Sequence, residues 1–216
     1  MKPIMLFLIV LISFNFAQAD IFNSEKVLPT SQAIVCRDLN HNILEAQLYD
    51  YYEAKVLRDI NINLGSSNVV FLEKALMAIE RLKKYDHKRY VIYRSRINDF
   101  LSQTLFKENI SIDSEEYSGD MIYPKGCKIE NVLKIFKGDD LPGNKKYLIN
   151  SDIWNAFDNN SKAGLIIHEA MLQRNIFTLN YKITKRMHAR TFNSLIASDL
   201  IKKITQEEYT DFIGRI

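Results

Sequence analysis

Two neighbouring apolar stripes at helical spacing constrain the fold of this chain more than any other feature. The first covers residues 68–85 and the second residues 90–105. In both, apolar residues recur at i, i+3, i+4 and i+7, which places them on one face of a helix. The stripes therefore predict a helical hairpin that turns near Asp86 and His87. Their residues are Leu72, Ala75, Leu76, Ile79 and Leu82, then Tyr90, Tyr93, Ile97, Phe100, Leu101 and Leu105.

Helical spacing extends to much of the remaining chain. It covers residues 43–57, 163–177 and 184–201, while Asn150 or Ser151 and Asn160 or Ser161 are candidate N-caps. Only 7 glycines and 4 prolines occur among the 216 residues, which favours long helices over a turn-dense sheet architecture. The chain ends with a capping box, Thr205 to Glu208, that predicts a short helix through Phe212.

The middle of the chain differs from these helical segments. Between residues 109 and 147, apolar and polar residues alternate at positions 110–112, and the segment contains several glycines and prolines. This pattern predicts short strands and loops, including a strand at 146–149. Residues 20–41 have no clear period and suggest an extended lead-in. The sequence predicts an α+β fold, a mainly α-helical single domain over residues 20–216 with a few short strands in the middle.

The first residues have the form of a secretory signal peptide. A charge at Lys2 precedes an apolar stretch at residues 4–16, and Ala17-Gln18-Ala19 fits the small-x-small cleavage pattern. The apolar stretch is shorter than the roughly 20 residues that span a bilayer as a helix, which makes an uncleaved anchor the weaker interpretation. We expect residues 1–19 to be removed, no transmembrane segment to remain, and the protein to be periplasmic or secreted.

Cysteine usage agrees with an exported chain. Cys36 and Cys127 are its 2 cysteines, and an even number in an exported protein predicts a single disulfide. The alternative is two unrelated buried thiols. Two cysteines are too few for a thiolate-rich structural zinc site.

The run Ala163 to Leu172 carries the strongest chemical signal. On a helix, His168 and Glu169 flank an apolar stripe, so both leave water if that stripe faces the core. Burying such groups costs several kcal/mol unless each has a hydrogen-bond, ionic or metal partner. His-Glu is half of the zincin signature, yet Leu172 occupies the position of the second histidine. A zinc site would need His41, His87, His188 or distant carboxylates to complete it. We therefore expect the protein to have no cofactor, and a bound zinc ion is the alternative hypothesis.

Two hypotheses for His168 and Glu169 do not involve a metal. In the first, Arg186, Arg190 and Asn193 recur at i, i+4 and i+7 on the next helix, and their polar ends meet Glu169 in a buried network. In the second, His168 and Glu169 serve as acid, base or binding groups in a small-molecule or glycan pocket. Gly164, one turn before His168, leaves space for a backbone or a ligand to approach.

A family resemblance rests on the same stretch. Leu165-Ile166-Ile167-His168-Glu169-Ala170, with Trp154 and Gly126-Cys127 before it and residues 190–198 after it, resembles uncharacterised exported proteins of Bdellovibrio-like predatory bacteria. The resemblance covers most of the mature chain and implies a periplasmic or outer-surface location. In the commoner family form a tyrosine and a basic residue follow His-Glu-Ala, whereas here residues 171–173 precede Arg174.

Charge patterning adds one further candidate surface. Seven Lys and Arg residues lie between Arg81 and Arg96 with Asp86 as the single acid, in a chain of net charge +3. This basic cluster could attract an anionic polymer or a lipid surface, although a solvated face and turn of the hairpin is the favoured interpretation. No recognisable nucleic-acid module or nucleotide, serine-hydrolase or EF-hand motif occurs.

These features lead to two functional hypotheses. The first is an exported, non-enzymatic envelope protein that acts through binding to an unknown partner and contains a buried network of His168, Glu169 and an arginine. The second is a hydrolase, metal-dependent or not, that acts on peptide or cell-wall material through His168 and Glu169. An enzyme needs this pair at a water-accessible cleft, whereas a structural network needs it enclosed.

Overall fold

The described strands form two sheets. The structure, a computed structural model, describes residues 28–29, 31–112, 122–136, 141–172 and 183–215. The first sheet has the order β1-β6-β7-β4, from β1 (Leu28–Pro29), β6 (Leu133–Ile135), β7 (Tyr147–Asn150) and β4 (Thr104–Lys107). In it β4 runs parallel to β7, and the other pairs are antiparallel. The fold class is α+β, as predicted.

The second sheet is antiparallel, with the order β3-β2-β5. Its strands are β2 (Gln32–Arg37), β3 (Ile43–Leu48) and β5 (Cys127–Asn131). Cys36 lies directly opposite Cys127 in the β2–β5 register, and their sulfur atoms are 2.04 Å apart. The predicted disulfide is therefore confirmed, and the alternative of two separate thiols is wrong.

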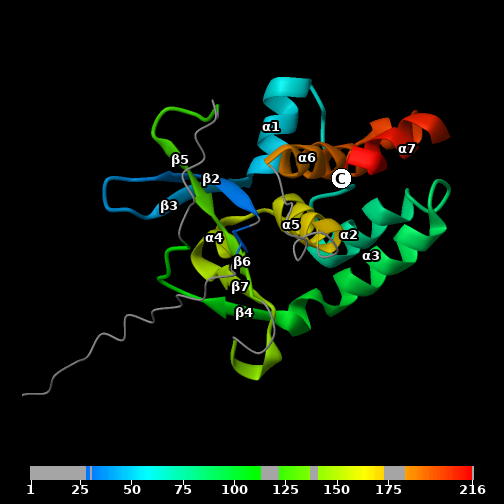
Figure 1. Cartoon of the computed structure of the whole chain (residues 1–216). Helices are drawn as coiled ribbons and strands as arrows, with labels where there is room; N and C mark the ends of the chain where they lie inside the picture. The colour runs from blue at the N-terminus through cyan, green and yellow to red at the C-terminus, as the bar shows by residue number, and fades with distance from the viewer. Residues whose placement is uncertain (1–27, 30, 113–121, 137–140, 173–182, 216) are drawn as a thin grey trace, which may run out of the picture.

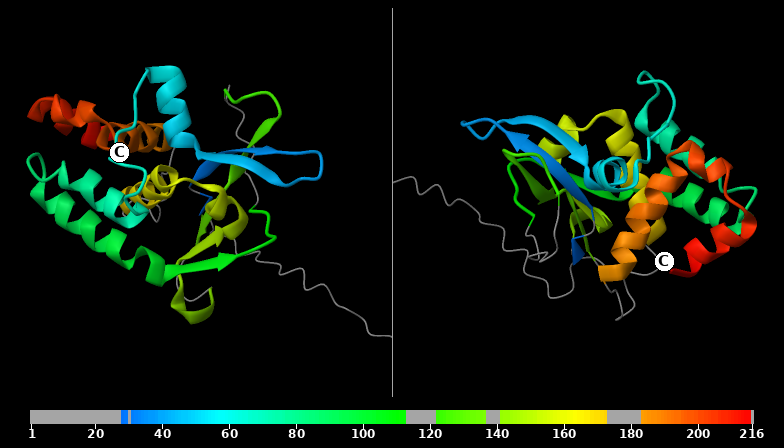
Figure 2. Two further views of the ribbon diagram at one scale, coloured as in Figure 1. Left: turned by 180° about the vertical axis from the view of Figure 1, so that it is seen from behind. Right: turned by 90° about the horizontal axis from the view of Figure 1, so that it is seen from above.

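Most of the helices gather on the side of the molecule opposite the β2–β3 hairpin, which projects from the body, whereas α4 (Ser151–Ala156) lies against β3 and β7 (Figures 1 and 2). The other helices are α1 (Tyr49–Arg58), α2 (Phe71–Glu80), α3 (His87–Phe100), α5 (Asn159–Leu172), α6 (Ile183–Ile196) and α7 (Gln206–Arg215), with short 3-10 turns at Leu101–Gln103, Pro142–Asn144 and Asp199–Lys202. Helices α2 and α3 pack as the predicted hairpin, and Asp86 caps α3 by accepting a hydrogen bond from Arg89 N–H.

Helix α5 is the centre of the core. It packs against α2, α3, α6 and β3, and nearly every residue from Ser161 to Leu172 is buried. A helix that is apolar on nearly all sides is typical of such an enclosed position. One apolar cluster extends from Ala33 on β2 to Tyr209 on α7 and includes Leu165, Ile166 and Ile167 of this helix.

Several boundaries differ from the predictions. The expected helix over 43–57 is a strand and a helix, because Ile43–Leu48 pairs with β2 before α1 begins. The expected helix over 90–105 ends at Phe100, and Thr104–Lys107 instead forms β4 beside β7. Residues 110–112 form no strand; the Ile110 carbonyl accepts a hydrogen bond from Asn150 Nδ2. In each case a tertiary partner outweighs the local pattern.

The helix ends follow known capping chemistry. Asn150 Oδ1 accepts hydrogen bonds from the N–H groups of Asp152 and Ile153, which confirms Asn150 as the N-cap of α4. Thr205 and Glu208 form the predicted reciprocal capping box of α7. Helix α5 begins at Asn159 rather than after Ser161 and is preceded by Asp158, whose Oδ1 accepts from Ser161 N–H.

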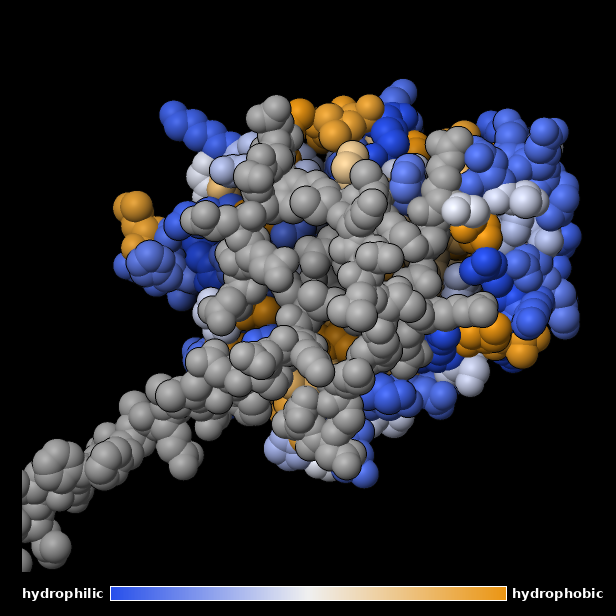
Figure 3. Space-filling model, in the orientation of Figure 1, coloured by the Kyte–Doolittle hydropathy of each residue, from blue (hydrophilic) through white to orange (hydrophobic). Residues whose placement is uncertain are grey.

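The surface on the face of Figure 3 is mainly hydrophilic where it is described, with separate apolar patches. Within the described ranges, no helix is both long and apolar enough to cross a membrane. The predicted signal peptide, residues 1–19, lies outside the described residues.

Candidate functional site

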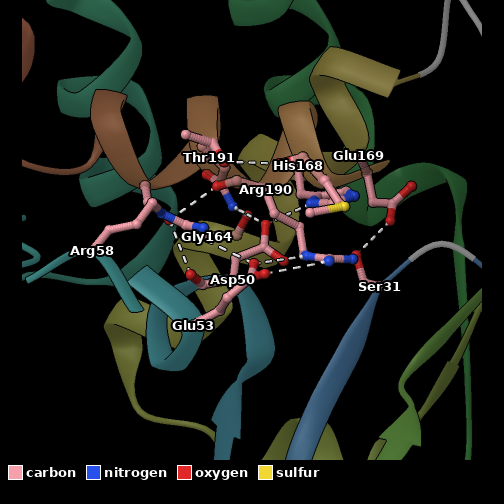
Figure 4. Close-up of polar contacts among 12 residues, drawn as sticks. Ser31, Asp50, Glu53, Arg58, Gly164, His168, Glu169, Arg190 and Thr191 are labelled. Carbon is pink, nitrogen blue, oxygen red and sulfur yellow. Dashed lines mark hydrogen bonds and ion pairs between the residues drawn. The ribbon is translucent and has the colours of Figure 1, made fainter. Parts of the chain in front are cut away.

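His168 and Glu169 both lie in the interior on α5. Their exposed fractions are 1% and 0%. The pair faces α1, α6 and the start of β2, as Figure 4 shows. The sequence prediction that both groups leave water is therefore correct, and each must have polar partners.

The partner of His168 is Asp50 in the first turn of α1. His168 Nδ1 and Asp50 Oδ2 are 2.5 Å apart, and the same oxygen accepts a hydrogen bond of 2.7 Å from Asn193 Nδ2 on α6. Asn193 also donates to the Gly164 carbonyl at 3.0 Å, so a single amide joins α1, α5 and α6. His168 Nε2 is buried and has no hydrogen-bond partner among the described residues.

The electrostatics favour a charged pair. Burial alone would raise the pKa of Asp50, but the charge of His168 and the hydrogen bonds from His168 and Asn193 lower it below its usual value. Burial alone would lower the pKa of His168, but Asp50 through its charge and hydrogen bond, together with the charge of Glu169, raises it overall. Each partner therefore stabilises the ionised form of the other.

A second ion pair lies one turn further along α1. Arg190 of α6 donates from Nε to Glu53 at 2.9 Å and from its terminal nitrogen to the same carboxylate at 3.4 Å. Arg58 adds a contact of 3.5 Å to Glu53. The Arg190 guanidinium also lies 5.3 Å from the centre of the Tyr49 ring. A planar guanidinium suits such a two-point contact with a buried carboxylate.

Glu169 contacts β2. Its Oε1 accepts a hydrogen bond of 2.6 Å from the Ser31 hydroxyl, and Ser31 is itself 0% exposed. Burial and the charge of Glu169 together raise the pKa of Tyr147 on β7. The helix face that holds His168 and Glu169 thus connects α1 and α6 to the sheets.

The predicted network exists, but its pairing differs from the expectation. Arg190 was expected to meet Glu169, and among the described residues it binds Glu53, while Glu169 accepts from Ser31. The side chain of Arg186 lies outside the described residues. Asp50, Glu53 and Ser31 were not among the predicted partners. Two acids at i and i+3, Asp50 and Glu53, in the tyrosine-rich segment 49–53 were the signal that could have identified α1 as the partner.

The histidines considered for a zinc site do not join this cluster. His41 is exposed on the β2–β3 hairpin, His87 is exposed at the start of α3, and His188 is partly buried on α6. Across the described part of the chain, no group of three or more His, Cys, Asp or Glu side chains is placed to hold a metal. The network can therefore act as a buried ionic contact, in which His168 Nε2 has no hydrogen-bond partner among the described residues.

Much of the basic cluster at Arg81–Arg96 binds the protein itself. Arg81 donates to the carbonyls of Ile196 and Ser198 after α6, and Arg96 donates to the Ala170 carbonyl near the end of α5. Lys84 Nζ donates to the Lys202 carbonyl. Cations near helix C-termini satisfy the last carbonyl groups and complement the helix dipole. These contacts favour a structural role for this cluster.

Searches against protein-family models, curated proteins and solved structures found no match.

Proposed function

We propose that the protein is exported to the bacterial envelope and acts there through binding. The observation that carries the proposal is the Cys36–Cys127 disulfide, which joins β2 to β5 at directly opposed positions. Disulfides persist in oxidising compartments and are rare in the cytosol. The leader-like residues 1–19 support the same location, as does the resemblance of Leu165–Ala170 to exported proteins of predatory bacteria.

The burial of the ionic network supports binding over hydrolysis. The exposed fractions are 1% for His168, 0% for Glu169 and 1% for Asp50, whereas a hydrolase needs its acid and base at a water-accessible cleft. Their contacts instead connect three helices, α1, α5 and α6, with Ser31 directly before β2. We therefore assign the network to holding the fold in one arrangement, which is one use of buried polar groups.

One observation keeps hydrolase activity as the second candidate. Asp50 binds His168 Nδ1 and leaves Nε2 without a partner among the described residues, which is the orientation of a histidine that transfers a proton as a general acid or base. For catalysis, water and substrate would have to reach Nε2. The two candidates therefore differ in whether removal of the imidazole affects stability or chemistry.

Export is tested by expressing the full chain in a Gram-negative host and determining the N-terminus and thiol content of the recovered protein. We expect a periplasmic protein that begins at Asp20 and has no free thiol. The variant Ala19→Arg should retain its leader, because the cleavage site needs a small residue there. A wild-type protein in the cytosol with residue 1 retained and two free thiols would refute export.

The choice between binding and hydrolysis is tested with His168→Ala. Elemental analysis of protein purified without chelator, with thermal unfolding measured in parallel, separates the candidates. A structural network predicts no stoichiometric metal and a large loss of stability in the variant. A transition metal that the wild type holds and the variant lacks, with unchanged melting, would favour the hydrolase. The exposed His87→Ala variant is the matched control.

A further inference from the structure

An open groove lies at the carboxyl ends of the two parallel strands β4 and β7. It has a volume of about 520 Å³ and is lined by Phe106, Lys107, Glu108, Ser151, Trp154 and Asn155. The first three residues end or follow β4, and the last three belong to α4, which directly follows β7. Ligand sites favour the carboxyl ends of parallel strands, and this volume falls within the usual range of about 300 to 1,000 Å³.

Aromatic side chains form the apolar part of the groove. The Trp154 ring lies 5.3 Å from Phe71 in an edge-on arrangement and 5.5 Å from Phe106, so its position is fixed by packing. Phe106 is 38% exposed, whereas Trp154 is 7% exposed. Phe106 thus presents a partly open ring beside a buried one. An aromatic ring fixed by its neighbours provides a preformed surface for an apolar ligand face.

The polar lining contains both signs of charge and both hydrogen-bonding roles. Lys107 and Glu108 both line the groove, so its lining carries one positive and one negative side chain. Ser151 and Asn155 add a hydroxyl and an amide, which can each donate and accept. A phosphate or an acidic polymer would require an excess of positive charge. This lining instead suits an uncharged ligand that carries many hydroxyl groups and has an apolar face.

We propose that this groove binds a neutral glycan chain. A sugar ring has hydroxyl groups at its edges that match Ser151, Asn155 and the charged pair, and a face of C–H groups that packs on Phe106. This assignment rests on the proposed binding function in the envelope and names its ligand class. It leaves the buried His168 network outside the binding site.

The observations favour a glycan over an extended peptide. A peptide strand could add to β4, but β4 contains only the four residues Thr104–Lys107. The N–H group of Thr104 already donates to the Leu101 carbonyl. Strand addition draws its affinity from a ladder of main-chain hydrogen bonds, and so short a strand provides few of them. Side-chain recognition in the groove is therefore the stronger basis for binding.

The test uses the fluorescence of Trp154, which is the only tryptophan of the chain. Oxidised protein from full-chain expression is titrated with chitohexaose, with maltohexaose, with polyphosphate and with a neutral threonine-rich peptide. We expect a saturable change in emission with at least one of the two glycans. The affinity should stay constant when the ionic strength rises from about 0.05 M to about 0.5 M, since a neutral ligand is not screened.

Matched variants locate the effect. Phe106→Ala and Asn155→Ala should each weaken glycan binding, Phe106→Ala by about tenfold. Val91→Ala, which is half exposed on α3, should bind like the wild type. Because Asn155 is exposed, its variant keeps the test valid if Phe106→Ala fails to fold.

Three results would overturn the glycan assignment: no saturable change with either glycan, a response to polyphosphate or the peptide alone, or glycan binding that both groove variants retain. All of these binding measurements are made on purified protein. A failure of the glycan assignment is therefore distinguishable from a failure of the export proposal, which is tested by leader cleavage and thiol content.

Discussion

His168 Nδ1 lies 2.5 Å from Asp50 Oδ2 in the interior of the protein, and the two side chains are each 1% exposed. A charged pair at this depth has little net effect while it is intact, because mutual attraction offsets the loss of hydration. Loss of one partner is costly, because the other charge remains buried without compensation. This asymmetry makes the stability of the protein sensitive to either residue.

Asp50→Asn should therefore lower the free energy of unfolding by about 3 to 5 kcal/mol. The amide keeps the shape of the carboxylate but removes the charge that His168 and Asn193 bind. Urea unfolding followed by circular dichroism measures the change. Glu73→Gln in the first turn of α2, where the acid is exposed, is the control and should stay within about 0.5 kcal/mol of the wild type. An equal effect of the two substitutions would contradict the buried pair.

The same pair predicts how stability depends on pH. The pKa of His168 is raised in the fold, so its contribution is complete below the ordinary histidine value of about 6.5 and disappears as pH rises through the folded value. The pKa of Asp50 is lowered, so its contribution is present above about 3.9 and disappears as pH falls through the folded value. We expect the highest melting temperature between these limits.

Thermal unfolding between about pH 2 and pH 9 tests this dependence, whose slope for one proton is at most about 1.4 kcal/mol per pH unit. The decline on the alkaline side should disappear in His168→Gln and persist in the exposed His87→Gln variant. A wild-type melting temperature that keeps rising above neutral pH would rule out a protonated His168 in the fold.

The sequence was sufficient to predict the helical hairpin, the α5 helix, the disulfide and the burial of His168 and Glu169. These features depend on local periodicity, on cysteine count and on the cost of placing a charge in an apolar stripe. The hairpin of α2 and α3 is an example, because its stripes, its turn and the cap at Asp86 all occur within one segment.

The ionic partners could not be found in the same way. Asp50 and His168 are 118 positions apart, and Arg190 and Glu53 are 137 positions apart. Their pairing depends on how α1 crosses α5 and α6, which local patterns do not encode. The β3 strand was missed for a related reason, because its partner β2 has no distinctive period of its own.

Gly164 lies where α5 packs closely on α1 and β3, and we expect the stability of the fold to be sensitive to substitution at this position. A Cβ atom built there would overlap the ring of Tyr51 and would lie 2.6 Å from Leu48 Cδ2. Gly164→Ala should lower the free energy of unfolding by about 1 to 3 kcal/mol or more, as overpacking of a core does. Gly214→Ala on α7 is the matched control, since its Cβ would meet nothing within 4 Å. There the helix should gain up to about 1 kcal/mol.

Reduction of the Cys36–Cys127 bond should destabilise the fold without removing a large apolar contact. The bond closes a loop with a sequence separation of 91 residues, for which the chain-entropy model gives about 4 to 5 kcal/mol. Denaturation with and without a thiol reductant measures this difference. The double variant Cys36→Ala with Cys127→Ala should match the reduced wild type and should not respond to reductant. Equal stability of the oxidised and reduced wild type would show that the β2–β5 pairing and the core hold the sheet without the bond.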